Sequence, residues 1–143
     1  PKYYTVVRNP YDRLVSAWFH DKLGSASKFT TSALNQFRNI KANGHFKTDY
    51  RFYLEHIPNE DILYVGQIEN MEDVISNIGQ ILQKQANRSY MHSNQATTKS
   101  KSRWGGKKEE IILTPELRSA LRVYLAPEYD FLEQRFGIIY ERP

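Results

Sequence analysis

The chain has 143 residues, of which 40% are hydrophobic and 13% aromatic, and it contains no cysteine. This length suits one domain with one core, and the apolar content excludes an intrinsically disordered chain. The absence of cysteine excludes disulfide scaffolds, thiolate metal sites and cysteine nucleophiles. The apolar runs are only a few residues long, far short of the ~20 that a membrane-spanning helix needs, so no membrane segment is predicted.

The net charge of +4 is unevenly distributed along the chain. Residues 84–108 carry seven basic side chains and no acidic one, whereas the rest of the chain carries 13 basic and 16 acidic side chains. The same segment is rich in Ser, Asn, Gln and Thr and lacks a helical or strand period, which predicts a long basic loop at about residues 84–110. Such a loop is either solvated or a flap that closes over a polyanionic ligand.

The first elements are predicted close to the start of the chain. Residues 3–7 (Tyr-Tyr-Thr-Val-Val) form a β-branched and aromatic run, which predicts a strand buried on both faces. Asn9 then supplies an N-cap and Pro10 a first helical residue, with Asp12 in the first turn. An apolar stripe at helical spacing extends this helix to about residue 22, and a Ser/Thr-rich loop is predicted after Gly24.

The pattern of strand followed by helix occurs a second time. Residues 62–66 predict another buried strand, and a helix with a regular apolar period follows from Asn70. Shorter helical patterns occupy residues 32–41 and residues 50–57. This alternation predicts an α/β fold with a parallel sheet.

After the basic segment the chain returns to helical patterns. Thr114 and Pro115 repeat the combination of cap and proline that starts a helix. A further helix is predicted over residues 127–136, ending before Gly137. Neither an internal repeat nor a domain boundary is apparent, so residues 1–143 are predicted to form a single domain.

Arg8 and Ser16 are the candidate ligand-binding residues. Arg8 stands between the first predicted strand and the first predicted helix, where open parallel sheets bind their ligands. A guanidinium, free N–H groups and a helix dipole together suit an oxyanion such as phosphate. Ser16 falls opposite the apolar stripe, so core packing does not account for it. The alternatives are a solvated or carboxylate-paired Arg8 and a hydrated Ser16, while Asp12 is interpreted as a capping residue and not as an acid or base.

These residues also carry a resemblance to a known family. Residues 5–18 (Thr-Val-Val-Arg-Asn-Pro-Tyr-Asp-Arg-Leu-Val-Ser-Ala-Trp), with Lys22 after them, resemble the 3′-phosphate-binding segment of sulfotransferases that use 3′-phosphoadenosine 5′-phosphosulfate (PAPS). The closest similarity is to the carbohydrate sulfotransferases. Looser similarities follow in the family's order along nearly the whole chain, at Glu69-Asn70, at His92-Ser93-Asn94 with Thr97 and Thr98, and over residues 113–137.

The resemblance implies a fold and a reaction. The fold would be a P-loop-kinase-like parallel sheet with flanking helices, and the reaction would move a sulfuryl group from PAPS to a hydroxyl of a carbohydrate acceptor, leaving 3′-phosphoadenosine 5′-phosphate (PAP). Arg8 and Ser16 match the family's pair that holds the 3′-phosphate. The cations Lys99, Lys101 and Arg103 of the basic loop would also bind the cofactor, by covering the nucleotide, or would contact an acidic acceptor.

The residues that would contact the acceptor are indicated less strongly than those that would bind the cofactor. The resemblance assigns substrate contacts to His92, Asn94 and Trp104. Tyr11, Trp18 and Trp104 are candidates for stacking on adenine or sugar. The alternative for these aromatic residues is packing in the core.

The resemblance also exposes a gap. In the family, the strand and the lysine-containing loop that hold the 5′-phosphosulfate, together with the usual catalytic base, lie upstream of the segment matched by Arg8. They would precede Pro1, so the catalytic residues are left unassigned. We therefore expect a partial domain, completed by upstream residues, a partner chain or a second copy. The sequence contains no targeting segment, so the compartment is left open between the cytoplasm and the Golgi lumen.

Metal binding is not predicted from the sequence. The four histidines, His20, His45, His56 and His92, show no metal-ligand spacing among themselves. Structural or solvated roles are therefore predicted for all of them.

Two other functions stay open. One is a catalytically incomplete subdomain that binds phosphoadenosine without performing chemistry. The other is a basic nucleic-acid-binding module, suggested by the sequence pI of about 9.3 and by residues 84–108. That module lacks a recognisable motif and interleaved stacking aromatics, so no nucleic acid partner is expected.

Overall fold

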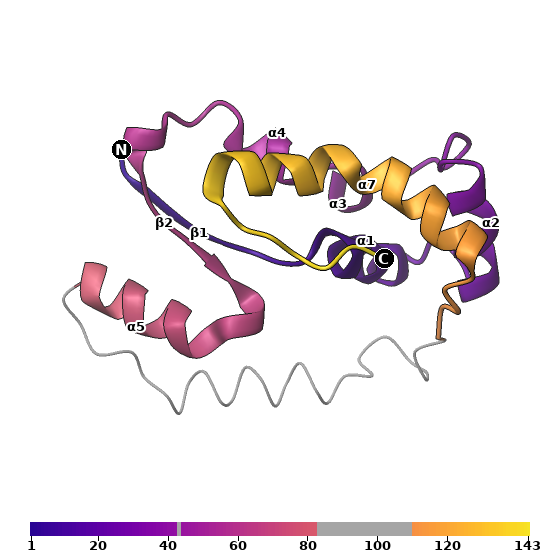
Figure 1. Ribbon diagram of the computed structural model, residues 1–143, viewed down its shortest axis with the longest axis horizontal. Helices are drawn as coiled ribbons and strands as arrows, with labels where there is room; N and C mark the ends of the chain where they lie inside the picture. Colours follow the sequence, from indigo (N-terminus) through magenta and orange to yellow (C-terminus); the bar gives the residue numbers. More distant parts are fainter. Residues whose placement is uncertain (43, 83–109) are drawn as a thin grey trace. The chain divides into compact units, whose positions relative to one another are not determined.

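The computed structural model describes residues 1–42, 44–82 and 110–143 and has a mixed α/β architecture (Figure 1). The chain divides into two compact units. The first consists of Pro1–Val7 and Glu60–Lys108, and the second of Arg8–Asn59 and Glu109–Pro143. The short 3₁₀ turn η1 (Asn59–Asp61) carries the chain from the second unit into the first.

The first unit contains the predicted parallel sheet. Strand β1 (Tyr3–Val7) pairs in parallel with β2 (Ile62–Gln67), and Val7 lies opposite Gln67 in the register. A 3₁₀ turn, η2 (Ile68–Asn70), then leads into helix α5 (Met71–Ile81). Both strands and the following helix were predicted from the sequence, and these predictions are confirmed.

Helix α5 packs closely against β2 at a glycine. A Cβ atom at Gly66 would lie 2.7 Å from Val74 Cγ2 and 2.8 Å from the Tyr64 ring, so only glycine fits without displacement. The prediction that β1 is buried on both faces is wrong, and β2, predicted as a buried strand, is only partly buried. Tyr3 and Tyr4 are 41% and 44% exposed, because the described residues of this unit supply only one long helix to cover two strands.

The second unit is helical. Its elements are α1 (Pro10–His20), α2 (Ala26–Leu34), α3 (Gly44–Lys47), α4 (Tyr50–Leu54) and α7 (Pro115–Phe136). Trp18 of α1 is fully buried and makes edge contacts with Phe29 and Phe46. Helix α7 closes this aromatic core with a row of buried leucines at helical spacing, Leu117, Leu121 and Leu125.

The α1 prediction is confirmed, but α2 lies where a loop was predicted. Ser25 caps the helix by accepting a hydrogen bond from the Lys28 N–H at 3.1 Å. Phe29 and Ala33, four residues apart, are both fully buried, and this packing outweighs the weak helix propensity of the surrounding Ser and Thr residues. The helix ends where Gln36 and Phe37 adopt positive φ angles of 53° and 54°, so the helix predicted over residues 32–41 is displaced toward the N-terminus.

The predicted break at Pro127 is also wrong, because α7 continues through it. Proline removes one N–H, whose helical acceptor would be the carbonyl of Val123. Val123 is 69% exposed, so its carbonyl lies on the solvent-facing side of the helix, where water can hydrogen-bond to it. The helix instead ends at Gly137, which adopts the left-handed conformation with φ 66°.

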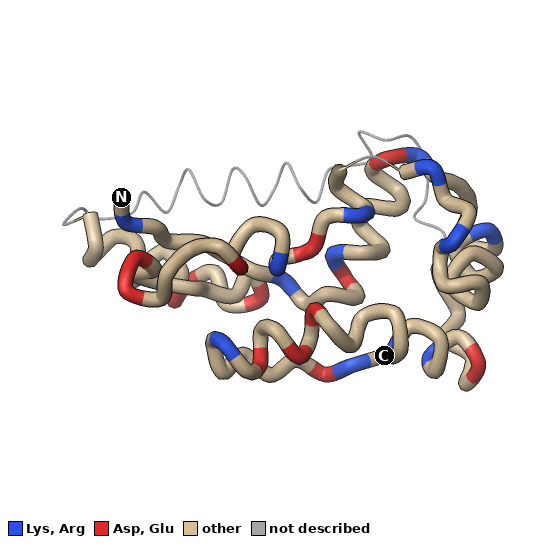
Figure 2. Tube along the Cα trace, turned by 90° about the horizontal axis from the view of Figure 1, so that it is seen from above, with Lys and Arg blue, Asp and Glu red and all other residues tan. Residues whose placement is uncertain are grey.

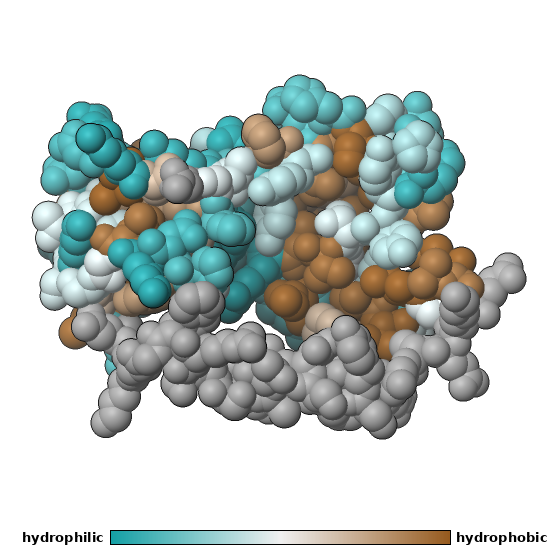
Figure 3. Space-filling view, turned by 180° about the vertical axis from the view of Figure 1, so that it is seen from behind, coloured by the Kyte–Doolittle hydropathy of each residue, from teal (hydrophilic) through white to brown (hydrophobic). Residues whose placement is uncertain are grey.

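The surface of the described residues is mixed in character. Acidic and basic residues are interspersed along the trace (Figure 2), as expected for the part of the chain outside residues 84–108. Apolar side chains also reach the surface (Figure 3), the most exposed being Ile112, Ile139 and Val123. Among the described helices, none is both long and apolar enough to cross a membrane.

Candidate functional site

Arg8 and Ser16 line the same cavity of the second unit. The cavity has a volume of about 300 Å³, and its wall also includes Arg13, His20 and His45. Arg8 follows directly after β1, and Ser16 lies about two turns into α1, where it is exposed. The structure therefore brings together the two residues that the sequence singled out.

The local fold fixes where Arg8 lies. Its backbone N–H donates a 2.8 Å hydrogen bond to the Tyr50 hydroxyl at the start of α4. The next residue, Asn9, caps α1, and its Oδ1 atom accepts a hydrogen bond from the Tyr129 hydroxyl at 2.5 Å. Contacts with α4 and α7 thus hold the backbone on both sides of the Arg8 side chain.

The cavity is positively charged. Arg8 and Arg13 both line it, and no Asp or Glu does so among the described residues. Arg13 is already paired, since its Nε and Nη2 atoms donate to the two carboxylate oxygens of Glu128 at 2.8 Å each. Within the described ranges no carboxylate lies within ion-pair distance of Arg8. Arg8 is therefore the cation that can accept an anionic ligand.

The ion pair between Arg13 and Glu128 is largely buried, with Glu128 only 2% exposed. Burial raises the pKa of the Glu128 carboxyl above its ordinary value, against the lowering effect of the Arg13 contact. Burial also disfavours the charge on Arg13, but its hydrogen bonds and proximity to Glu128 raise the pKa of Arg13 above its ordinary value. Arg13 also donates to the backbone carbonyls of His45 and Thr48, so it ties α1, α3 and α7 together around the cavity.

The prediction about the backbone N–H groups at the start of α1 needs correction. The prediction of free N–H groups in the first turn of α1 is wrong for its first two residues, because Pro10 has no N–H and the Tyr11 N–H is already used. It donates to Asn9 Oδ1 at 3.1 Å and to the Tyr129 hydroxyl at 3.3 Å. Asp12 is exposed in the first turn, while the cap itself is Asn9. Anion binding at this site therefore depends mainly on the Arg8 and Ser16 side chains.

Two of the three aromatic residues considered for stacking, Trp18 and Tyr11, lie in or against the core, and the third, Trp104, lies outside the described residues. Trp18 is fully buried, and its Nε1–H donates to the carbonyl of Gly24 at 2.9 Å. Tyr11 is half-buried and packs against the same core. Trp18 is therefore not available to a ligand, as the core interpretation predicts.

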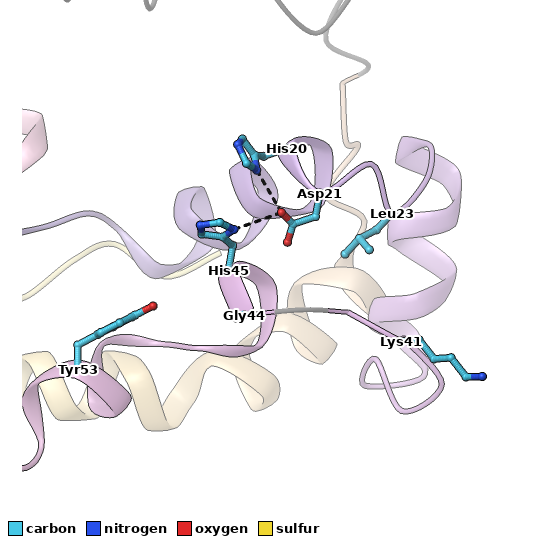
Figure 4. Close-up of a pocket in the computed structure, with 7 residues that line it drawn as sticks. All are labelled: His20, Asp21, Leu23, Lys41, Gly44, His45 and Tyr53. Atoms are coloured by element: carbon cyan, nitrogen blue, oxygen red, sulfur yellow. Dashed lines mark hydrogen bonds and ion pairs between the residues drawn. The ribbon is translucent and has the colours of Figure 1, made fainter.

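A second group of polar side chains lies beside the cavity. Asp21 Oδ1 lies 3.1 Å from His20 Nδ1 and 3.5 Å from His45 Nδ1 (Figure 4). These three residues line an adjoining cavity of about 580 Å³, and His20, His45 and Tyr53 border both cavities. The sequence gives no sign of this cluster, because His45 is far from His20 along the chain and the turns between them follow no recognisable pattern.

Several predicted site residues cannot be placed relative to this cavity. His92, Asn94, Lys99, Lys101, Arg103 and Trp104 lie outside the described residues, as does the predicted basic loop. The predictions made for them stay predictions. The site as described consists of Arg8, Ser16 and their neighbours in the second unit.

Comparison with models of protein families, with curated proteins and with solved structures finds no match to this chain. The functional interpretation therefore depends on the residues themselves. Arg8 and Ser16 carry it, since they combine a guanidinium without a carboxylate partner in the described ranges with a hydroxyl on the same cavity.

Proposed function

We propose that this chain binds PAPS and belongs to a PAPS-dependent sulfotransferase that acts on a hydroxyl of a carbohydrate. The observation that supports the proposal most is that Arg8 and Ser16, which match the family's phosphate-binding pair, line one cavity with no acidic side chain among its described lining residues. The parallel pairing of β1 with β2 is compatible with the P-loop-kinase-like sheet that we propose with it.

In this proposal the 3′-phosphate occupies the cavity beside Arg8. The guanidinium presents a planar fork of N–H donors that matches two phosphate oxygens. The Ser16 hydroxyl donates one further hydrogen bond. Arg13, whose charge is already compensated by Glu128, shapes the wall without having to leave its partner.

The proposed reaction is an in-line sulfuryl transfer. The oxygen of the acceptor hydroxyl bonds to sulfur, the bond from sulfur to the 5′-phosphate oxygen breaks, and PAP leaves with the electron pair of that bond. The hydroxyl proton passes to a base, for which we assign no residue. Arg8 and Ser16 contribute by holding the cofactor at its far end, which orients the sulfuryl group toward the acceptor.

Calorimetric titration of PAP into three variants tests the binding step. Arg8→Ala should lower the affinity by about 10- to 150-fold, because charge-assisted hydrogen bonds contribute about 1.5–3 kcal/mol. Ser16→Ala, which removes a neutral donor, should lower it by about fivefold. Arg38→Ala removes the same charge from an exposed position that does not line the cavity and should leave the affinity unchanged. Equal losses in Arg8→Ala and Arg38→Ala would show that PAP senses only net charge.

Transfer itself is tested with sulfur-labelled PAPS and a set of polysaccharide acceptors, on a chain extended upstream to include the expected 5′-phosphosulfate loop and base. Label on the acceptor that disappears in Arg8→Ala supports the sulfotransferase. Tight PAP binding without transfer to any acceptor would support the catalytically incomplete phosphoadenosine-binding subdomain instead. Equally tight binding of single-stranded nucleic acid and PAP would favour the basic nucleic-acid-binding module.

A further inference from the structure

The cluster formed by His20, Asp21 and His45 has the chemistry of a metal site. One ligand atom from each residue, two imidazole nitrogens and one carboxylate oxygen, lies within 4.8 Å of the others. We propose that these three side chains bind a divalent transition metal ion of the zinc class. This proposal is independent of PAPS binding, although the two cavities share His20 and His45.

Two of the three separations between the ligand atoms, those from Asp21 to each imidazole, fit a tetrahedral ion. Zinc binds imidazole nitrogen at ~2.0–2.1 Å, so two ligand atoms on one tetrahedral ion lie roughly 3.3 Å apart. Asp21 Oδ1 lies 3.1 Å from His20 Nδ1 and 3.5 Å from His45 Nδ1. Asp21 Oδ1 faces both imidazoles (Figure 4), whose ring centres are 5.2 Å apart. The side chains of His20 and His45 are exposed, so they have room to rotate toward one ion.

The backbone that carries the ligands is held by the core. His20 is the last residue of α1, and Asp21 caps that helix through its own N–H, which donates to the Ala17 carbonyl at 2.9 Å. His45 lies on α3 next to Phe46, which is 1% exposed and contacts the Trp18 ring. Ligands attached to such a fixed framework lose little freedom when they bind a metal, which favours affinity.

Two further features favour a cation at this position. Asp21 Oδ2 is buried and has no hydrogen-bond partner among the described residues, and this burial is less costly when a cation bound to the same carboxylate compensates its charge. The cluster also stands at the C-terminal end of α1, an eleven-residue helix, where the helix dipole stabilises positive charge.

The donor set selects the class of metal. Two imidazole nitrogens with one carboxylate suit zinc and its neighbours, whereas calcium and magnesium prefer oxygen donors. The imidazoles are accessible, with side chains 51% and 73% exposed for His20 and His45, so an ion can enter. The fourth coordination position would open toward the cavity of about 580 Å³, where water or an anion can complete the shell.

Calorimetric titration of Zn²⁺ into the chain, prepared without a polyhistidine tag and without nucleotide, tests the proposal. We expect one saturable site, together with visible absorption typical of a tetrahedral site when Co²⁺ replaces Zn²⁺. His45→Ala and Asp21→Asn should each lower the affinity at least about 100-fold, since even indirect partners of metal ligands affect affinity by 10–100-fold. His56→Ala, which removes an exposed histidine outside the cluster, should leave the affinity unchanged.

Thermal unfolding with and without Zn²⁺ tests metal binding even in a variant that is less stable than the unmodified chain. Zn²⁺ should raise the melting temperature of the unmodified chain and of His56→Ala, because ligand binding to the folded state stabilises it. It should not raise the melting temperature of Asp21→Asn, whose shape is nearly unchanged. Absence of a saturable zinc site in the unmodified chain, or equal loss of binding in His56→Ala and His45→Ala, would overturn the proposal. Neither result depends on whether the chain binds PAP.

Discussion

Replacement of Arg13 by methionine should strongly destabilise the second unit. The change removes both 2.8 Å hydrogen bonds to Glu128 and the donors to the carbonyls of His45 and Thr48. Glu128 is only 2% exposed, so water can compensate its carboxylate only poorly. Removal of one partner of a buried pair costs about 3–5 kcal/mol, a large share of the roughly 5–15 kcal/mol that stabilise a typical domain.

Urea unfolding followed by circular dichroism measures this loss. The double variant Arg13→Met/Glu128→Met removes both charges, and it should regain most of the lost stability because no unpaired buried carboxylate is left. Arg51→Met serves as the matched control, since Arg51 pairs with Asp49 at 2.7 Å but its side chain is 45% exposed. An exposed pair contributes about 0–1 kcal/mol. If the double variant is as unstable as Arg13→Met, or if Arg51→Met is equally damaging, the reasoning from the buried charge is wrong.

Two further predictions concern the hydrophobic core and the loss of stability at high pH. Trp18→Ala should lower the free energy of unfolding in urea by about 3–5 kcal/mol, because removal of a fully buried indole leaves a cavity. Phe52→Ala, at a side chain that is 66% exposed, should change this free energy little. Similar losses in the two variants would contradict the assigned core. Burial raises the pKa of Tyr129 from 10.0 to about 12, so the stability contributed by its neutral phenol is full below about pH 10 and is lost as the pH rises toward about 12. Tyr129→Phe should therefore lose less unfolding free energy over this range than the unmodified chain, and an equal loss in both would contradict the prediction.

The sequence predicts the elements best where local signals agree. At α1 the cap Asn9, the proline at the first helical position and a regular apolar stripe all indicate one helix start, and the structure has it there. Strands β1 and β2 follow from their β-branched and aromatic composition. Their exposure could not be predicted, because burial depends on how many helices cover the sheet and not on the strand sequence.

Tertiary packing accounts for the elements that the sequence misplaces. Helix α2 forms in a Ser/Thr-rich segment because Phe29 and Ala33 enter the core, a contact with partners far away in the chain. Helix α7 passes through Pro127 because the lost hydrogen bond falls on its exposed side. Local propensity is a weak guide in both cases, since it is smaller than the free energy of burying a large side chain.

The candidate site also has one part that could be predicted from the sequence and one part that could not. Arg8 and Ser16 are close in sequence on one strand-to-helix junction, so their common cavity could be predicted from spacing. The pairing of Arg13 with Glu128 and the approach of His45 to Asp21 join distant segments. Such contacts are fixed by how α3 and α7 pack on α1, which no local pattern in the chain specifies.

The most direct test of the proposed function compares two nucleotides on the unmodified chain. Calorimetry with PAP and with adenosine 5′-phosphate, which lacks the 3′-phosphate, isolates the contribution of the group assigned to Arg8 and Ser16. The proposal predicts that PAP binds at least about tenfold more tightly, since charge-assisted contacts to the extra phosphate contribute about 1.5–3 kcal/mol. Equal affinities for the two nucleotides would contradict the assignment of Arg8 and Ser16 as a 3′-phosphate site.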